Sequence, residues 1–232
     1  MKEISIVIPF YNEEKNVAFI INDILNFFEK NNTSYEIIVV NDGSADGTTK
    51  VLNEFKENKN IIVVTHKKNL GYGATLRDGF AAAKGDLIFF TDSDRQFDIN
   101  DIVPFLEKIN PSAGSGQVDF VAGYRKNRKD PFIRKLYAFL FGFSSMIFFG
   151  VKIRDMDCAF KLFKSYVLKD MELVSSGALI NLEILAKAKK RGYKYVELPV
   201  NHFKRTEGKQ TGGSFKVVIE AIFQFFLLWK SI

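Results

Sequence analysis

The chain has 232 residues, of which 47% are hydrophobic and 26% are charged. That composition supports a sizeable folded core and argues against intrinsic disorder. A single cysteine, Cys158, excludes an internal disulfide and makes a reducing compartment the default expectation. The formal net charge of +6 favours an anionic partner such as a nucleotide, a phospholipid headgroup or a nucleic acid. The first residues soon turn acidic, so we expect no signal peptide.

Apolar runs typical of buried strands alternate with helical patterns along the first half of the chain. The predicted strands cover residues 4–10, 35–42, 60–66, 86–92 and 118–124. The predicted helices cover residues 13–30, 46–57, 74–84 and 99–109. This alternation predicts an α/β fold, in which a mostly parallel sheet is covered by helices on both faces. In such sheets, ligands bind at the carboxyl ends of the strands.

Polar segments follow the first four predicted strands. In chain order they read PFYNEE, NDGSADGT, KKNLGYG and TDSDRQ. Because the carboxyl ends of parallel strands meet at one edge of the sheet, we expect these four segments to converge on one site.

The segment TDSDRQ contains two carboxylates, Asp92 and Asp94, directly after an apolar strand. Carboxylates this close repel each other unless a cation lies between them. Oxygen ligands suit Mg²⁺ or Mn²⁺, which share their remaining positions with water and substrate phosphates. Gln96 can add a neutral oxygen. The other interpretation is that an aspartate caps the following segment, but the position at the sheet edge favours the metal site.

The segments NDGSADGT and GYGATL carry glycines and further polar groups. Turn chemistry and helix capping explain Gly43, Asp46 and Gly47. Asp42 is the better functional candidate, since its carboxylate can accept a hydrogen bond from a nucleotide base or a ribose hydroxyl. GYGATL begins at Gly71 and lacks the third glycine of the dinucleotide-binding fingerprint. We expect it to let the backbone pass close to a nucleotide.

Two apolar segments mark the second half of the chain. Leu136–Val151 follows a basic run over 124–135, and Val217–Trp229 lies near the end. Both are shorter than the roughly 20 apolar residues that a membrane-spanning helix needs. They are either buried core helices or interfacial helices, about 132–150 and 215–230, that lie in the headgroup layer. The arginines and lysines beside the first segment favour the interfacial interpretation.

The motifs resemble those of a known enzyme family. IVIPFYNEEKNV, VVNDGSADGT, NLGYGATLRDGF and FTDSDRQFD, in this order, resemble the family 2 glycosyltransferases of GT-A fold. The later AGYR, DMDCAFKLF, NLEIL, RGYKYVELPV and FKRTEGKQTGGS are similar to the dolichyl-phosphate mannose synthase and polyprenyl-phosphate glycosyltransferase branch. The resemblance implies one GT-A domain over 1–232, with a nucleotide-sugar-binding half (1–124) and an acceptor-binding half (125–232).

The resemblance also implies roles for individual residues. The donor nucleotide sugar would be bound by Pro9, Tyr11, Glu13, Asp42, Gly71 and Asp92. Mg²⁺ or Mn²⁺ would be held against the diphosphate by Asp92, Asp94 and Gln96. Catalysis would rest on Asp94 and on the arginines that receive the acceptor phosphate and steady the diphosphate, Arg125, Arg134 and Arg205. The chain departs from the family pattern at two positions, where Asn41 replaces a common aspartate and Ala138 replaces a hydroxyl.

The implied reaction moves mannose or glucose from a GDP- or UDP-sugar to a polyprenyl or dolichyl phosphate, with inversion, at the cytoplasmic face of a membrane. A phosphate monoester has a second pKa of about 6, so the acceptor is already ionised and needs no general base. The leaving diphosphate needs a cation, and arginines must align the two anions. The implied partners are the nucleotide sugar, the polyprenyl phosphate, the membrane surface and, as one means of anchoring, a separate membrane subunit.

Other functions remain open from the sequence. A family 2 transferase acting on a sugar hydroxyl in cell-surface polysaccharide synthesis would need a carboxylate base, for which Asp157 and Glu183 are candidates. An inactive relative that only binds nucleotide sugar is a second alternative. A nucleic-acid partner would explain the charge, but no recognised module is present and an acidic sheet edge repels phosphate backbones. We therefore expect no nucleic acid.

Four further residues carry expectations. Either Asp155 or Asp157 is expected to pair with an arginine near the acceptor pocket, and Glu183 to do the same from its helix. Cys158, in CAFKLF, is expected to be core with an inert thiol. We expect His202 to pack beside the strand that precedes it.

Overall fold

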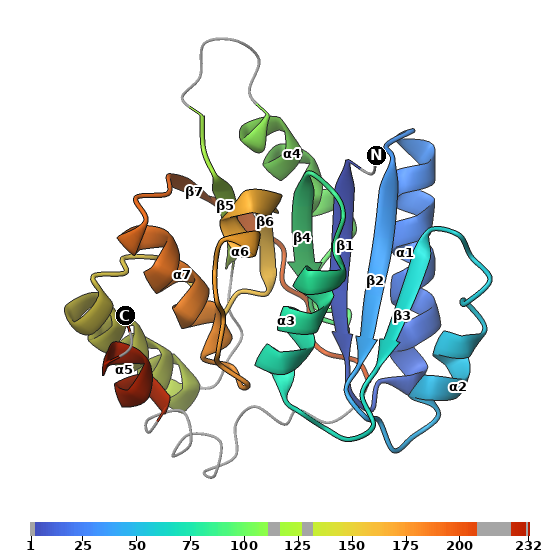
Figure 1. Ribbon diagram of the computed structural model, residues 1–232, viewed down its shortest axis with the longest axis horizontal. Coiled ribbons are helices and arrows are strands. Elements are labelled where there is room, and N and C mark those ends of the chain that lie inside the picture. The colour runs from blue at the N-terminus through green and yellow to red at the C-terminus, as the bar shows by residue number, and fades with distance from the viewer. Residues whose placement is uncertain (1–2, 111–116, 127–131, 208–223, 231) are drawn as a thin grey trace.

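The computed structural model describes residues 3–110, 117–126, 132–207, 224–230 and 232, and the side chains of 132–139 lie outside that description. A seven-stranded sheet in the order β3-β2-β1-β4-β6-β5-β7 runs through the molecule (Figure 1). Its strands are β1 (Ile4–Phe10), β2 (Tyr35–Asn41), β3 (Ile61–Thr65), β4 (Leu87–Thr91), β5 (Phe120–Arg125), β6 (Phe160–Lys164) and β7 (Tyr195–Val200).

The sheet is mostly parallel, as the sequence predicts. Strands β1 to β5 begin and end within two residues of the predicted bounds. Strand β6 pairs antiparallel with both β4 and β5, whereas β5 and β7 pair parallel. No strand was predicted at β6, because Lys161 and Lys164 interrupt its apolar pattern, yet Lys161 is as buried as its apolar neighbours.

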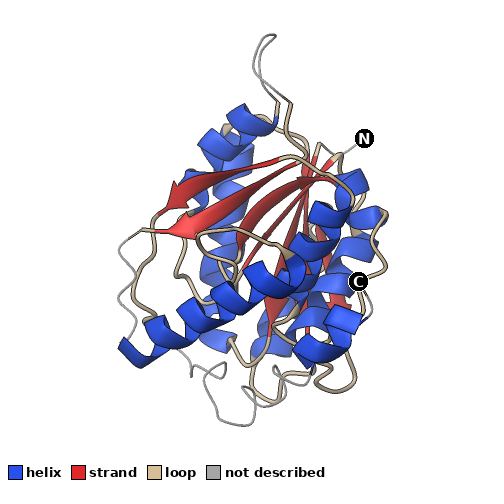
Figure 2. Ribbon diagram, turned by 90° about the vertical axis from the view of Figure 1, so that its left-hand side faces the viewer, coloured by secondary structure: helices blue, strands red, loops and turns tan. Residues whose placement is uncertain are grey.

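Helices cover both faces of the sheet (Figure 2). They are α1 (Glu14–Lys30), α2 (Thr48–Asn53), α3 (Tyr72–Ala82), η1 (Ile99–Ile102), α4 (Val103–Ile109), α5 (Phe132–Phe149), α6 (Ser165–Lys169) and α7 (Ile180–Lys190). Alternate residues of β4 enter different cores: Phe89 packs with α1 and α4, and Phe90 packs with α3, α6 and α7. The predicted helix over 46–57 is shorter in the structure, since only α2 is formed there.

Helix α5 packs against a helical segment over residues 224–230. The ring of Phe225 lies edge-on to Phe141, Phe148 and Phe149, with ring centroids 5.1 to 6.0 Å apart. Phe225 and Leu228 are buried and belong to the same apolar core as Phe90 and residues of α7. Among the helices in the described ranges, none combines the length and the apolar character needed to cross a membrane.

Candidate active site

Asp92 and Asp94, called here the acidic pair, follow β4 at the carboxyl edge of the parallel strands. Between Asp94 and Gln96 the chain turns at Arg95, which has a φ of 59°. The guanidinium carbon of Arg95 lies 4.2 Å from the centroid of the Phe19 ring. The helix that follows, η1, is capped by Asp98, which accepts a hydrogen bond from the Asn100 backbone N–H at 2.9 Å. The residue that caps a helix here is therefore Asp98, while Asp94 accepts a local hydrogen bond from the Gln96 backbone N–H.

The surroundings of the pair disfavour two negative charges. Burial and the charge of Asp94 raise the pKa of Asp92 to about 7. Burial also raises the pKa of Asp94, against the lowering effect of the Arg205 guanidinium. In the part of the chain that the structure describes, no group of three or more His, Cys, Asp or Glu side chains is arranged to hold a metal. Two adjacent carboxylates disfavoured as anions are the kind of oxygen donors that a divalent cation stabilises.

Gln96 connects the acidic pair to the segment after β7. Its backbone N–H donates to Asp94 Oδ1 at 3.2 Å, and its side-chain amide donates to the Phe203 carbonyl at 2.8 Å. The Phe203 backbone N–H donates in return to the Gln96 carbonyl at 2.9 Å. The amide nitrogen is therefore occupied, and the predicted contact of Gln96 with a metal depends on its side-chain oxygen.

Arg205 bridges the acidic pair and the first loop. Its Nη1 lies 3.6 Å from Asp94 Oδ2, and its Nη2 forms an ion pair with Glu13. Its Nε donates to the Glu207 carbonyl at 2.7 Å. Glu13 also accepts from the Asn16 side chain at 2.5 Å, and burial raises the pKa of Glu13. The structure thus gives Glu13 a partner in Arg205, and a contact of Glu13 with the donor stays a prediction.

Arg125 is held at the end of β5 by Asp155. The Arg125 Nε lies 2.6 Å from Asp155 Oδ2, and its Nη2 lies 2.7 Å from Asp155 Oδ1. Burial alone would lower the pKa of Arg125, but the hydrogen bonds and charge of Asp155 raise it above its usual value. Of the two candidate aspartates, Asp155 is therefore an arginine partner. Arg134 belongs to α5, and its side chain lies outside the described part.

The loops after β1 and β2 are joined by hydrogen bonds. The Asn12 backbone N–H donates to Ser44 Oγ at 3.0 Å, and the Ala45 backbone N–H donates to Asn12 Oδ1 at 2.8 Å. Beside them, Pro9 is buried on β1, and Tyr11 is 41% exposed. The predicted donor-binding loops therefore form one connected surface, on which Tyr11 presents its ring to solvent.

Asp42 lies at the end of β2, where it is 3% exposed. Its Oδ1 accepts from the Leu70 backbone N–H and contacts His66 Nδ1, both at 2.7 Å. Its Oδ2 accepts from the Gly71 backbone N–H at 2.9 Å. The other ring nitrogen of His66 lies 2.9 Å from Asp78 Oδ2. In this arrangement Asp42 holds the loop after β3, and the predicted contact of Asp42 with a base or ribose stays a prediction.

The glycines of GYGATL make room for another part of the chain. Gly71 has a φ of 98°, and a Cβ added there would lie 2.5 Å from the Ser176 carbonyl oxygen. A Cβ at Gly73 would lie 2.8 Å from the Gly177 carbonyl oxygen. The Gly73 backbone N–H donates to the Ser176 carbonyl at 2.7 Å. In the structure both glycines closely approach the segment before α7, and the expected close approach to a nucleotide stays a prediction.

Glu183 stabilises that segment from α7. It is fully buried and accepts from the backbone N–H groups of Val174 at 2.9 Å and Ser175 at 2.8 Å. Lys187 Nζ lies 2.6 Å from its Oε1. The expectation that Glu183 pairs with an arginine is wrong, because a lysine one helical turn away reaches the same carboxylate.

The predictions for Cys158 and His202 agree with the structure. Cys158 is buried, and burial raises the pKa of its thiol to about 12. The ring of His202 packs edge-on against Phe97, with centroids 5.4 Å apart. Both residues contribute to packing beside the site.

Two residues of the site were not predicted from the sequence. The Tyr72 hydroxyl donates to Asp92 Oδ1 at 2.9 Å. Lys161 is 1% exposed, and its Nζ donates to the carbonyls of Met156 and Cys158 and to Asn181 Oδ1. A lysine inside an apolar strand pattern signals a buried charge with partners. Tyr72 gave a weaker signal, because GYGATL was interpreted through its glycines alone.

The chain is similar to known proteins in sequence and in fold. The family model "Glycosyl transferase family 2" matches residues 5–171. The chain is 34% identical over 208 residues to the dolichyl-phosphate beta-glucosyltransferase ALG5A of Trichomonas vaginalis, covering 85% of this chain and 64% of that protein. It is 29% identical over 220 residues to an undecaprenyl-phosphate 4-deoxy-4-formamido-L-arabinose transferase of Aeromonas hydrophila, covering 94% of this chain and 65% of that protein. The chain thus spans a little under two thirds of the length of these two relatives.

Solved structures show the same fold. Glucosyl-3-phosphoglycerate synthase of Mycobacterium tuberculosis, in complex with Mn²⁺ and UDP-glucose, superposes with a TM-score of 0.72 at 18% identity, covering 100% of this chain and 80% of that one. Mannosyl-3-phosphoglycerate synthase of Rubrobacter xylanophilus superposes with a TM-score of 0.72 at 17% identity, covering 100% of this chain and 76% of that one. With its GT-A-like sheet and its family match, the chain belongs to glycosyltransferase family 2 and is related to the polyprenyl-phosphate glycosyltransferases.

Proposed function

We propose that this member of family 2 is a glycosyltransferase that moves a hexose, mannose or glucose, from a GDP- or UDP-sugar to a polyprenyl phosphate with the help of Mg²⁺ or Mn²⁺. The observation that carries the proposal is the partly buried acidic pair, Asp92 and Asp94, with Arg205 Nη1 3.6 Å from Asp94 Oδ2. Relatives named as dolichyl- or undecaprenyl-phosphate transferases support the class of acceptor.

In this proposal the donor lies along the carboxyl edge of β1, β2 and β4. Pro9, Tyr11, Glu13, Asp42 and Gly71 bind the nucleotide, and Tyr11 is exposed enough to pack against a base. Asp92, Asp94 and Gln96 hold the divalent ion, which when bound neutralises charge on the leaving diphosphate. Structures of the Mycobacterium tuberculosis synthase contain Mn²⁺ or Mg²⁺ together with UDP, which supports a divalent ion as the companion of the donor.

The acceptor phosphate approaches from the second half of the chain. A phosphate oxygen attacks the anomeric carbon, the bond from that carbon to the donor diphosphate breaks, and the diphosphate leaves with the electron pair. Because the nucleophile is already an anion, the work of the protein is to align two anions, which suits Arg125, Arg134 and Arg205. Asp155 fixes the Arg125 guanidinium in one orientation before any ligand binds.

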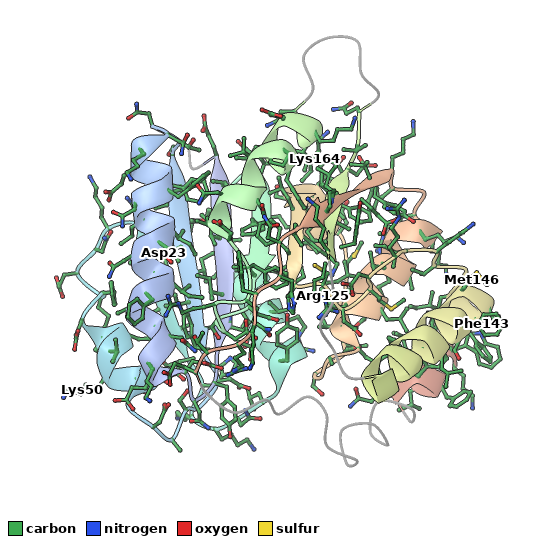
Figure 3. All side chains as sticks on the ribbon, turned by 180° about the vertical axis from the view of Figure 1, so that it is seen from behind. Asp23, Lys50, Arg125, Phe143, Met146 and Lys164 are labelled. Atoms are coloured by element: carbon green, nitrogen blue, oxygen red, sulfur yellow. The ribbon has the colours of Figure 1, made fainter. Side chains whose placement is uncertain are left out.

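We also propose that α5 and residues 224–230 lie on the cytoplasmic face of a membrane. An apolar surface supports this, made by Leu140, Phe143, Met146, Ile147, Phe148, Phe226, Leu227 and Trp229, each at least 37% exposed. Figure 3 shows Phe143 and Met146 on the outer side of α5, pointing away from the sheet. An apolar helix face of this kind, following a basic run, suits the headgroup layer of an anionic membrane. Anchoring by a separate subunit would use the same surface.

The two predicted halves fit this division of labour within one domain. We assign donor binding to residues 1–124 and acceptor binding to 125–232. Strand β6 of the second half lies between β4 and β5 of the first, so the halves share one sheet.

A second candidate is transfer to a sugar hydroxyl. One observation favours it: Asp157 is exposed, and its charge acts on Tyr72 and Arg125 beside the acidic pair. Asp157 could then serve as the carboxylate base that a hydroxyl acceptor needs. Glu183 suits that role poorly, because it is buried and bound to Lys187. The third possibility, an inactive nucleotide-sugar-binding relative, predicts donor binding without turnover.

One experiment tests the proposal directly. The protein is incubated with labelled UDP- and GDP-hexoses, short-chain polyprenyl phosphate and Mn²⁺ or Mg²⁺, and the lipid phase is extracted. We expect labelled lipid with at least one donor, and none from the Asp94→Asn variant or in excess EDTA. Label that appears only on added oligosaccharides supports the hydroxyl acceptor instead. Donor binding with no product of either kind overturns the assignment as an active transferase.

A further inference from the structure

Tyr72, at the start of α3, contacts the acidic pair although it lies far from that pair in the sequence. Its hydroxyl donates to Asp92 Oδ1 at 2.9 Å, joining the first residue of α3 to the end of β4. Among the described residues, Tyr72 provides a side-chain hydrogen bond to the Asp92 carboxylate. The other member of the pair, Asp94, contacts Gln96 and Arg205 instead.

The backbone on each side of Tyr72 is fixed. On one side, the Gly71 N–H donates to Asp42 Oδ2 at 2.9 Å. On the other, the Gly73 N–H donates to the Ser176 carbonyl at 2.7 Å. Neither Gly71 nor Gly73 has space for a Cβ, because the backbone of the segment before α7 lies directly against them. The Tyr72 ring also packs against the apolar core. The two backbone hydrogen bonds and the packing of the ring therefore fix the position of the Tyr72 hydroxyl.

A neutral hydroxyl is suited to a carboxylate that binds a cation. It donates one hydrogen bond and so holds the carboxylate plane in one orientation. It adds no positive charge that would repel a divalent ion, as a lysine at the same distance would. Carboxylate ligands of metals are commonly oriented by hydrogen bonds of this kind.

We propose that Tyr72 is a positioning residue for the metal site, which orients Asp92 through Oδ1 so that Oδ2 coordinates the ion that carries the donor diphosphate. This inference rests on the proposed function, because it assumes that Asp92 and Asp94 bind a divalent cation. It goes further in assigning a role to a residue outside the acidic segment. It also links the loop after β3, which Asp42 holds, to the metal.

The test is isothermal titration of UDP and of GDP into the full chain, with Mn²⁺ and again in excess EDTA. Tyr72→Phe keeps the ring and removes only the hydroxyl. We expect Tyr72→Phe to weaken the Mn²⁺-dependent binding on the order of tenfold, the size of one hydrogen bond to a charged group. Binding in EDTA and the melting temperature should remain those of the wild type.

The matched control is Tyr193→Phe, which removes a tyrosine–aspartate hydrogen bond, to Asp170 at 3.3 Å, on a different surface. It should leave both titrations unchanged. If Tyr72→Phe folds poorly, Tyr72→Met also lacks the hydroxyl while filling the apolar space, and is titrated in the same way.

A parallel titration of Asp92→Asn separates the two levels of the proposal. If Asp92→Asn removes the Mn²⁺-dependent binding and Tyr72→Phe keeps it in full, the role of Tyr72 is refuted and the metal site stands. If Asp92→Asn keeps Mn²⁺-dependent binding, the proposed metal site itself fails. Equal weakening of Tyr72→Phe with Mn²⁺ and in EDTA would mean a general structural role, which also contradicts the inference.

Discussion

Arg125 and Asp155 form a two-pronged ion pair, with Nε–Oδ2 and Nη2–Oδ1 distances of 2.6 and 2.7 Å. The Arg125 backbone N–H also lies 3.2 Å from Asp155 Oδ2. The carboxylate therefore fixes both the backbone and the guanidinium at the end of β5, leaving the remaining N–H groups of the fork for an anion.

Asp155→Asn should lower kcat/KM for lipid transfer by at least about tenfold, because an amide cannot accept the two parallel hydrogen bonds and Arg125 loses its fixed orientation. Removing one partner of a buried pair costs about 3–5 kcal/mol of stability, so chemical denaturation is measured alongside. Lys15→Ala, which removes an exposed pair to Glu207, is the control and should change both values little. Wild-type turnover by stable Asp155→Asn would show that this orientation is unnecessary.

Asp94→Asn should lower transfer by at least about 100-fold, because loss of one carboxylate weakens the hold on the cation that steadies the leaving group. The control is Asp98→Asn, in the same segment. Asp98 caps η1, so its replacement should cost at most about 1 kcal/mol of stability with turnover intact. Equal activity losses in the two variants would point to a shared folding defect.

Gly73→Ala should destabilise the protein by about 2 kcal/mol or more, because its Cβ would collide with backbone carbonyls that cannot move freely. Gly142→Ala is the matched control within α5, where an added Cβ meets nothing within 4 Å. There the same change should stabilise by about 0.5–1 kcal/mol, since alanine is the better helix former. Urea unfolding of both variants measures the difference. A stable Gly73→Ala protein would mean that the segment before α7 lies elsewhere.

The Cys158 thiol should resist alkylation in the folded protein. Burial raises its pKa to about 12, so at pH 8 the thiolate that reacts is scarce, and its share grows only as the pH rises toward that value. Iodoacetamide labelling followed by mass spectrometry should show slow modification at pH 8 and fast modification in urea. Rapid labelling of the native protein would contradict the buried position.

The apolar surface over α5 should bind anionic vesicles. Phe143→Ser combined with Ile147→Ser removes two exposed side chains, each contributing about 1.5–3 kcal/mol when buried in an apolar phase. Sedimentation with vesicles should therefore fall at least about tenfold in affinity. Val174→Ser replaces a comparably exposed apolar residue that is not part of this surface and should bind as the wild type does. Unchanged binding of the double variant would exclude this face as the membrane contact.

Much of the fold follows from local pattern. The runs of β1 and β4 are apolar except for Ser5 and Thr91, because both faces of a parallel sheet are covered. That pattern predicts the carboxyl edge where the acidic pair lies. Strand β6 escaped prediction because Lys161 breaks its pattern, and the partners that allow its burial come from a preceding loop and from α7. Side-chain pairing of this kind depends on contacts distant in sequence.

The same limit applies to the site. The acidic pair is visible in the sequence because its two members are two residues apart. Tyr72 and Asp92 are 20 residues apart and meet only after the sheet has formed. Asp42 was noted as a donor contact, but its hydrogen bonds to the loop after β3 arise from the neighbouring strand ends. Motifs locate chemical groups, and tertiary packing decides which of them touch.

The central claim is that a divalent ion joins the acidic pair to the diphosphate of the donor. Crystals grown with Mn²⁺ and UDP or GDP, measured at a wavelength where manganese scatters anomalously, test it directly. We expect one anomalous peak within coordination distance, about 2.0–2.3 Å, of carboxylate oxygens from Asp92 or Asp94 and of diphosphate oxygens. A bound nucleotide with no manganese at the acidic pair, or manganese held elsewhere, would contradict the account.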